Sequence, residues 1–168
     1  IAVPLFLNAP PASLHYILRD TGAREVVVSD QFEDLLKPVC KALGINLVVL
    51  RNPTSSELCA MPEVDRSRAA TILYTSGTTN LPKGVVITHQ NLEAQISTLV
   101  KAWAWSDEDH TLCVLPLHHV HGIVNVVCCS LWAGACCEFI PSFTAESVFR
   151  IFKQHKVNVF MAVPTIYY

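Results

Sequence analysis

Short apolar runs alternate along this chain with segments whose apolar residues recur at helical spacing, and this alternation constrains the fold more than any other feature. The apolar runs predict strands at residues 1–7, 25–30, 45–50, 69–74, 84–88, 111–115, 135–140 and 157–163. The segments between them predict helices at residues 11–20, 31–43, 89–103, 123–133 and 144–155. Because a helix between successive strands is typical of a parallel sheet covered by helices, we predict an α/β fold.

A polar stretch, residues 51–68, divides this alternation into two sheet-forming blocks. The stretch contains prolines and serines and lacks the periodicity of a helix or a strand, which is typical of a linker or surface loop. We therefore predict a first block at residues 1–50 and a second block at residues 69–168.

The composition indicates that both blocks belong to one larger domain. Charged residues make up 15% of the chain, against about 25% in typical soluble domains, and hydrophobic residues make up 51%. A free-standing domain with so few charges would expose apolar faces, so we expect the remainder of a longer parent chain to cover them. The ends, Ile1 and Tyr168, adjoin apolar runs and support the same expectation. The net charge of −2 gives no electrostatic basis for binding nucleic acid or an anionic membrane surface.

The seven cysteines do not follow a disulfide or zinc-site spacing. Their number is odd, and Cys128–Cys129 and Cys136–Cys137 are adjacent pairs. Because unpaired cysteine behaves as a small apolar residue, we predict free, buried thiols in a reducing, intracellular compartment, mitochondrial or cytoplasmic.

Residues 110–137 contain no Asp, Glu, Lys or Arg, and this length exceeds the roughly 20 residues of a membrane-spanning helix. Pro116, Gly122, Asn125 and Gly134 interrupt the run, however. We therefore predict a buried strand, a buried helix and a second buried strand, with no transmembrane segment, since strands covered on both faces are continuously apolar.

The segment "TSGTTNLPKG", residues 75–84, lies between two predicted strands and concentrates hydrogen-bond donors. Its hydroxyls and backbone N–H groups, with Gly77 allowing close approach and Lys83 supplying a positive charge, have the composition of a phosphate-binding loop. It is not a Walker A motif, because Lys83 is followed by Gly84 and Val85. An ordinary surface turn with hydroxyls in water is the alternative.

A second candidate loop, "LPLHHVHG" at residues 115–122, contains His118, His119 and His121. These histidines are too close together for the common structural metal spacings, and no acidic or cysteine ligand adjoins them, so we predict no metal site. From the residues alone, ordinary loop histidines and a ligand-lining role both remain open.

The stretch "ILYTSGTTNLPKGVVITHQNL", residues 72–92, closely resembles the phosphate-loop signature of the adenylate-forming enzymes, which include acyl-CoA synthetases, luciferases and peptide-synthetase adenylation domains. The resemblance implies an incomplete segment of the large N-terminal domain of such an enzyme. It implies that the following residues bind the β- and γ-phosphates of ATP: Thr75, Ser76, Gly77, Thr78, Thr79 and Lys83. Lys83 would also assist catalysis. Asn80 departs from the pattern, which has Gly or Ser there, but asparagine tolerates a left-handed turn better than most residues.

The histidine loop resembles the next motif of the same family, in which a histidine or aromatic residue borders the acyl pocket. His119 falls at the family's histidine position and would be catalytic, and His121 falls at a position that is often aromatic. The resemblance assigns to the acyl pocket His119, His121, Gly122, Pro164 and Thr165.

Within the family, the chain is most similar to malonyl-CoA synthetases, with the similarity concentrated in "LPLHHVHG" and "VPTIY". This similarity implies that the acid is malonate or methylmalonate and that ATP, Mg²⁺ and CoA take part. His121 would donate a hydrogen bond to the distal carboxylate of the acid. An arginine for the same carboxylate is not evident, because Arg150 lies on a predicted helix and we expect its side chain to be solvated.

The implied reaction is an AMP-forming acid–thiol ligation in two steps, acyl-AMP formation and transfer of the acyl group to CoA. The family's later motifs do not occur in these residues, so we expect this segment alone to be inactive. Two alternatives remain: an adenylation domain that loads a carrier protein, and a truncated product without catalytic function.

Overall fold

The computed structural model describes residues 1–51, 60, 62–75, 81–140, 142–154 and 156–168. These residues divide into two compact units. The smaller unit comprises Leu5–Val64 and Tyr74–Gly84, and the larger unit comprises Ile1–Pro4, Asp65–Leu73 and Val85–Tyr168. The prediction of blocks at residues 1–50 and 69–168 within one larger domain stays a prediction.

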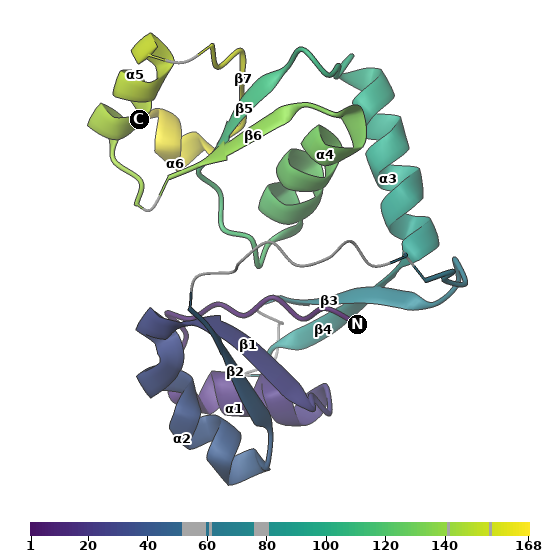
Figure 1. Ribbon diagram of the computed structural model, residues 1–168, viewed down its shortest axis with the longest axis vertical. Coiled ribbons are helices and arrows are strands. Elements are labelled where there is room, and N and C mark those ends of the chain that lie inside the picture. Colours follow the sequence, from purple (N-terminus) through teal and green to yellow (C-terminus); the bar gives the residue numbers. More distant parts are fainter. Residues whose placement is uncertain (52–59, 61, 76–80, 141, 155) are drawn as a thin grey trace. The chain divides into compact units, whose positions relative to one another are not determined.

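The smaller unit is a βαβ arrangement preceded by a helix (Figure 1). Its elements are α1 (Pro11–Asp20), β1 (Glu25–Ser29), the 3₁₀ turn η1 (Asp30–Phe32), α2 (Glu33–Leu43) and β2 (Asn46–Leu50). β1 and β2 pair in parallel. β1 alternates strictly, with Val26 and Val28 buried and Val27 exposed, so the helices cover one face of this pair. The core of the unit consists of Leu14, Leu18, Val26, Val28, Leu36, Val39 and Cys40.

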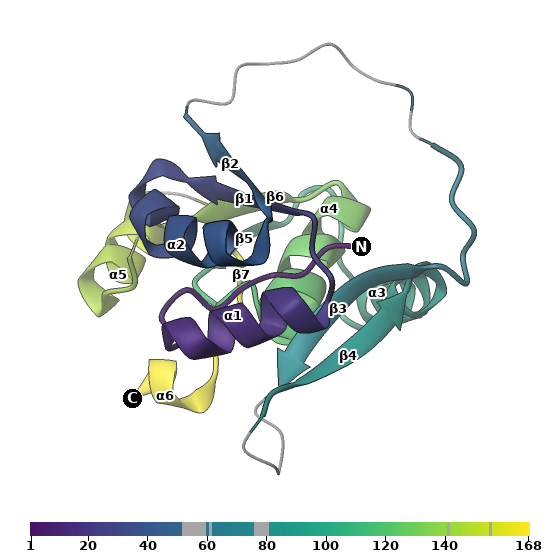
Figure 2. The same ribbon diagram turned by 90° about the horizontal axis from the view of Figure 1, so that it is seen from below.

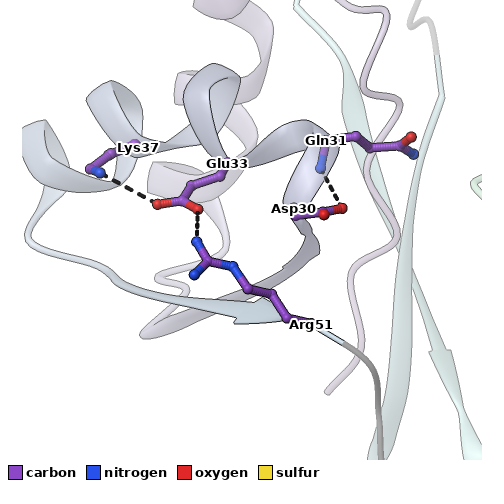
Figure 3. A network of polar contacts seen from close by, with 5 residues as sticks. All are labelled: Asp30, Gln31, Glu33, Lys37 and Arg51. Carbon is purple, nitrogen blue, oxygen red and sulfur yellow. Dashed lines mark hydrogen bonds and ion pairs between the residues drawn. The ribbon is translucent and has the colours of Figure 1, made fainter.

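A polar network ties the start of α2 to the end of β2 (Figure 3). Glu33 Oε2 accepts a hydrogen bond from Arg51 at 2.7 Å, and Glu33 Oε1 accepts one from Lys37 at 3.4 Å. Arg51 and then Lys37 lower the pKa of the Glu33 carboxyl group. Because the Lys37 and Arg51 side chains are largely exposed, the contribution of these ion pairs to stability is small.

The larger unit contains a three-stranded parallel sheet in the order β6-β5-β7. The strands β3 and β4 precede this sheet in the chain. From there to the C-terminus the elements are β3 (Ala69–Thr75), β4 (Lys83–Thr88), α3 (His89–Ala102), β5 (His110–Cys113), the π-helix η2 (His121–Cys128), α4 (Cys129–Ala133), β6 (Cys136–Phe139), α5 (Ala145–Gln154), β7 (Val159–Phe160) and α6 (Pro164–Tyr167). β3 and β4 form a separate two-stranded sheet, and Figure 2 shows them side by side.

Helices cover both faces of this parallel sheet. Leu112 of β5 packs against Val148 and Ile151 of α5 on one face. On the other face, Cys113 packs against Val126 of η2. A further cluster joins α3 to η2 and α4 through Ile96, Trp105, Val124 and Cys129. The α/β class predicted from the sequence is therefore confirmed. The order of strand, helix and strand predicted for residues 110–137 is also observed, but only β5 is buried along most of its length, whereas both ends of β6 are exposed. None of the helices in the described part of the chain is long and apolar enough to cross a membrane.

Three predicted elements are wrong in detail. Residues 1–7 do not form a strand, since only Ala2 pairs, in an isolated bridge with Thr71, and Pro4 has no N–H to continue a ladder. The last predicted strand, residues 157–163, is reduced to β7, and α6 follows it. The helix predicted at residues 123–133 begins earlier, at His121, and its first eight residues are a π-helix.

The prediction that the cysteines are free and buried is confirmed for some of the seven cysteines and wrong for another. Cys40, Cys113 and Cys129 are buried and free, and burial raises the pKa of the Cys129 thiol to about 11. Cys136 is exposed, so the prediction is wrong for this residue, which is the first of β6 and therefore lies at the sheet's rim. Cys59 lies outside the described residues.

The hydroxyl of Thr111, on the central strand β5, is fully buried and has no hydrogen-bond partner among the described residues. Thr111→Val should therefore raise the free energy of unfolding by about 1 kcal/mol, because it removes an unsatisfied polar group without changing the side chain's shape. The apparent unfolding temperature of the complete protein would report this. Thr98→Val is the matched control, since the exposed Thr98 hydroxyl already donates to the Ala94 carbonyl at 2.7 Å. A lower unfolding temperature for Thr111→Val would contradict the prediction.

Candidate active site

The two strands that flank the predicted phosphate loop end next to each other. Thr75 is the last residue of β3 and Lys83 is the first residue of β4. The Thr75 hydroxyl donates a hydrogen bond to the Lys83 carbonyl oxygen at 3.4 Å, which links the two strand ends. Ser76, Gly77, Thr78, Thr79 and Asn80 lie outside the described residues, so their predicted phosphate contacts stay predictions.

Lys83 is exposed, and within the described part of the chain its ammonium group forms no ion pair. A lysine without a carboxylate partner keeps its full charge available for an incoming anion. The predicted phosphate-binding residues that the structure describes, Thr75 and Lys83, are thus brought together at one end of the β3–β4 sheet.

β4 passes into α3 without an intervening residue. Thr88 is both the last residue of β4 and the N-cap of α3. Its hydroxyl accepts a hydrogen bond from the Asn91 N–H at 3.1 Å, and the Asn91 side chain accepts one from the Thr88 N–H at 3.0 Å. This reciprocal capping box fixes the junction between the end of β4 and the start of α3.

One contact at the start of the loop was not predicted from the sequence. The Tyr74 hydroxyl donates a hydrogen bond to Asp20 Oδ2 at 2.5 Å. Burial and this hydrogen bond raise the pKa of the Tyr74 hydroxyl, so it stays protonated and able to donate. The two residues are 54 positions apart, and no local sequence pattern indicates such a pair.

The histidine loop connects the end of β5 to η2. The rings of His118 and His119 lie 4.2 Å apart between centroids, tilted by 50°. Burial, and then the neighbouring His119, lower the pKa of His118, which therefore favours the neutral imidazole. His119 is exposed, and its backbone N–H donates to the Pro116 carbonyl oxygen at 3.3 Å.

Gly122 allows the first turn of η2 to lie directly against this loop. A Cβ atom at residue 122 would lie 2.4 Å from the Pro116 carbonyl oxygen and 3.2 Å from that of Leu115. Both neighbours are backbone atoms, so no side-chain rearrangement could make room. The observed conformation of the loop therefore requires glycine at this position.

His121 lines an open depression of about 450 Å³ in the larger unit. The other residues that line it are Trp103, Asn158, Val159, Phe160, Met161, Ala162 and Tyr167. Of the residues predicted for the acyl pocket, the structure places His121 on this depression, next to the β7 strand. His119 and Gly122 belong to the adjoining loop and helix turn, and Pro164 and Thr165 form the exposed start of α6.

A metal site does not form among the residues that the structure describes, since no three His, Cys, Asp or Glu side chains are grouped to hold an ion. The chemistry of these two loops is that of hydroxyl, ammonium and imidazole groups, which can bind the phosphates and carboxylates of a substrate.

Comparison with known proteins identifies the family. A family model described as AMP-binding enzyme matches residues 1–168, the whole chain. The chain belongs to the AMP-binding enzyme family. The resemblance read from "TSGTTNLPKG" and its neighbours is thereby confirmed.

Several malonate-activating members of the AMP-binding enzymes are similar to this chain. It is 44% identical over 177 aligned residues to the malonate–CoA ligase ACSF3, mitochondrial, of Homo sapiens, covering 99% of this chain and 31% of that protein. The crystal structure of ATP-bound MatB from Rhodopseudomonas palustris matches with a TM-score of 0.86 and 28% identity, covering 98% of this chain and 34% of that one. A malonyl-CoA ligase ternary product complex with methylmalonyl-CoA and AMP matches with a TM-score of 0.86 and 32% identity, covering 99% and 35%.

The chain therefore spans about a third of the length of these relatives. It is a homologue of the malonate–CoA ligases and shares the fold of the corresponding third of an adenylate-forming enzyme. The roles assigned to individual residues of this AMP-binding enzyme stay predictions.

Proposed function

We propose that the protein containing this chain is an AMP-forming acyl-CoA synthetase that activates malonate or methylmalonate. The observation that carries the proposal is the match over the whole chain to malonate–CoA ligases, at 44% identity with the human protein. The solved relative that holds methylmalonyl-CoA and AMP supports the same acid class and the same two products of activation and transfer. An ATP-bound relative supports ATP as the nucleotide.

The first step joins the acid to the nucleotide. A carboxylate oxygen of the acid attacks the α-phosphorus of ATP, and the bond to the bridging oxygen breaks, giving acyl-AMP and pyrophosphate. Thr75 and the rest of the phosphate loop bind the β- and γ-phosphates with hydroxyl and N–H donors, while Lys83 stabilises the negative charge that accumulates on the leaving pyrophosphate. Positioning and charge stabilisation of this kind are the main contributions that a protein makes to such a step.

Mg²⁺ fits this proposal as an ion that arrives with ATP. The described residues do not group three potential ligands, and Mg²⁺ is commonly held by substrate phosphates with only one or two carboxylates. When bound, it would neutralise phosphate charge next to the hydroxyls of the loop.

The second step transfers the acyl group to CoA. The CoA thiolate attacks the acyl carbon, and AMP leaves with the electrons of the broken acyl–phosphate bond. The buried cysteines take no part in this step, because the attacking sulfur belongs to CoA and burial raises the pKa of thiols such as those of Cys113 and Cys129.

The acid is recognised at the histidine loop. The depression next to His121 offers mostly apolar side chains, among them Val159, Met161 and Ala162, with the imidazole as a donor. We propose that His121 donates a hydrogen bond to the distal carboxylate and that His119 borders the reacting carboxylate. This hydrogen bond would be available to a dicarboxylate and not to a fatty acid, which has no distal carboxylate.

The proposed compartment is the mitochondrion. The human relative is named as mitochondrial, and the free thiols of the described cysteines are consistent with a reducing compartment.

Acid-dependent exchange of labelled pyrophosphate into ATP tests this function in the complete natural protein. We expect exchange with malonate and methylmalonate to exceed that with acetate or octanoate by at least about tenfold in kcat/KM, because only a dicarboxylate can use the distal donor. Formation of the CoA thioester from the same acids would separate a synthetase from a carrier-loading adenylation domain. Best exchange with a monocarboxylate would exclude the dicarboxylate assignment.

A further inference from the structure

We propose that Asp20, the last residue of α1, is a positioning residue for the ATP-phosphate site, acting through its hydrogen bond to Tyr74. The inference rests on the proposed function, because it assigns the site to ATP. It concerns a residue of the first block, outside both sequence motifs, to which neither motif gives a role.

The contact reaches the phosphate site in two steps. Asp20 Oδ2 accepts a hydrogen bond from the Tyr74 hydroxyl at 2.5 Å, and Tyr74 immediately precedes Thr75 at the end of β3. The Thr75 hydroxyl in turn donates to the carbonyl oxygen of Lys83. All four residues belong to the smaller unit. The hydrogen bond from α1 is therefore connected, through Tyr74 and Thr75, to the end of β3 and the start of β4, where the described phosphate-binding residues lie.

α1 is a rigid support for this contact. Leu14 and Leu18 are almost completely buried in the core of the smaller unit. The helix ends in a well-formed cap, in which the Thr21 hydroxyl donates to the Ile17 carbonyl oxygen at 2.8 Å and Gly22 adopts a left-handed conformation. The backbone of Asp20 is consequently held in a fixed place relative to the β1–β2 core.

The position of Asp20 is unfavourable for the helix itself. The C-terminal turn carries the negative end of the helix dipole, where a carboxylate is repelled and a basic residue such as Arg19 is favoured. Among the described residues, the hydrogen bond to Tyr74 is the one favourable side-chain interaction of Asp20. An acidic residue at this position lowers the stability of the helix, and a role in positioning Tyr74 would explain why it is present.

Steady-state kinetics of the complete protein test the inference with three substitutions. Asp20→Ala and Tyr74→Phe each remove the hydrogen bond and should raise KM for ATP about 3- to 10-fold, the range expected from one hydrogen bond. KM values for the acid and for CoA should stay within about twofold, since a role confined to the phosphate site does not act on them. Asp20→Asn keeps an oxygen that can accept from the Tyr74 hydroxyl and should restore KM for ATP.

The double variant and a matched control separate positioning from general destabilisation. Because both single substitutions remove the same bond, Asp20→Ala combined with Tyr74→Phe should resemble either one alone. Glu25→Ala is the control, since it removes an exposed side-chain hydrogen bond of the same unit, to Asn46 at 2.8 Å, that involves neither Asp20 nor Tyr74. It should leave KM for ATP unchanged.

If the wild-type protein is active and both Asp20→Ala and Tyr74→Phe keep its KM for ATP, this inference is overturned while the proposed function stands. A wild-type protein that exchanges pyrophosphate with no acid would instead overturn the proposed function. In that case amide hydrogen exchange still tests the inference, because Asp20→Ala and Tyr74→Phe should speed amide hydrogen exchange in β3 and β4 relative to Glu25→Ala. Equal amide hydrogen exchange rates in all of these variants would refute the proposed link between α1 and the strand ends.

Discussion

Lys83→Ala in the complete protein should slow acyl-adenylate formation by about 10²- to 10³-fold, the range found when one charge-stabilising donor is removed from an active site. Lys83 begins β4 next to Thr75, is exposed, and has no ion-pair partner in the described part of the chain. Its charge is therefore available to a phosphate group, and alanine would remove this part of the stabilisation of the departing pyrophosphate.

Single-turnover formation of acyl-AMP measures this step directly and separates it from transfer to CoA. Lys83→Arg, which keeps the charge but changes the donor geometry, should recover only part of the rate. Lys101→Ala is the matched control, because Lys101 is an exposed lysine in the last turn of α3 and belongs to neither loop. A Lys83→Ala rate equal to that of the wild type would remove Lys83 from the mechanism.

The second large effect is expected at Gly122. Gly122→Ala should lower the free energy of unfolding by about 1 to 3 kcal/mol, the usual effect of overpacking. The new Cβ would lie 2.4 Å from the Pro116 carbonyl oxygen, and backbone must move to relieve the overlap. Because that movement would displace the histidine loop, KM for the acid should rise about tenfold or more.

Thermal unfolding and the KM for malonate together measure this prediction. Gly44→Ala is the matched control, since Gly44 has a φ of +66° with no atom near its would-be Cβ. That substitution should reduce stability by about 1 kcal/mol through backbone strain alone and leave KM for the acid unchanged. An unaltered KM in Gly122→Ala would show that the histidine loop does not contact the acid.

Where the chemistry of single residues decides the structure, the sequence was sufficient to predict it. Thr88 caps α3, and Gly44 and Gly134 end α2 and α4 in left-handed conformations, which are the usual roles of threonine before a helix and of glycine after one. The apolar run at residues 25–30 predicts a strand, which β1 is, but only the structure shows that Val27 is exposed between the buried Val26 and Val28. The phosphate-loop motif was sufficient to identify the family.

Features that depend on the third dimension could not be predicted. η2 is apolar on nearly all sides, so its sequence does not distinguish a π-helix from an α-helix by periodicity. The hydrogen bond between Tyr74 and Asp20 joins residues that only the fold brings together. The apolar residues before Pro4 match a strand pattern, yet only Ala2 finds a partner. The depression next to His121 depends on where β7 lies beside the histidine loop, which local sequence does not specify.

Because β4 passes directly into α3, residues cannot be inserted at this junction without disturbing the structure. Thr88 must stay three positions before Asn91 for the capping box to close, so a single inserted residue at this junction would break both hydrogen bonds. The alignment to the human relative has 177 positions against the 168 residues of this chain, so at least nine positions there have no counterpart here. Those additional residues should be accommodated in polar connections such as residues 51–68, while the strand that begins with Lys83 keeps a fixed length.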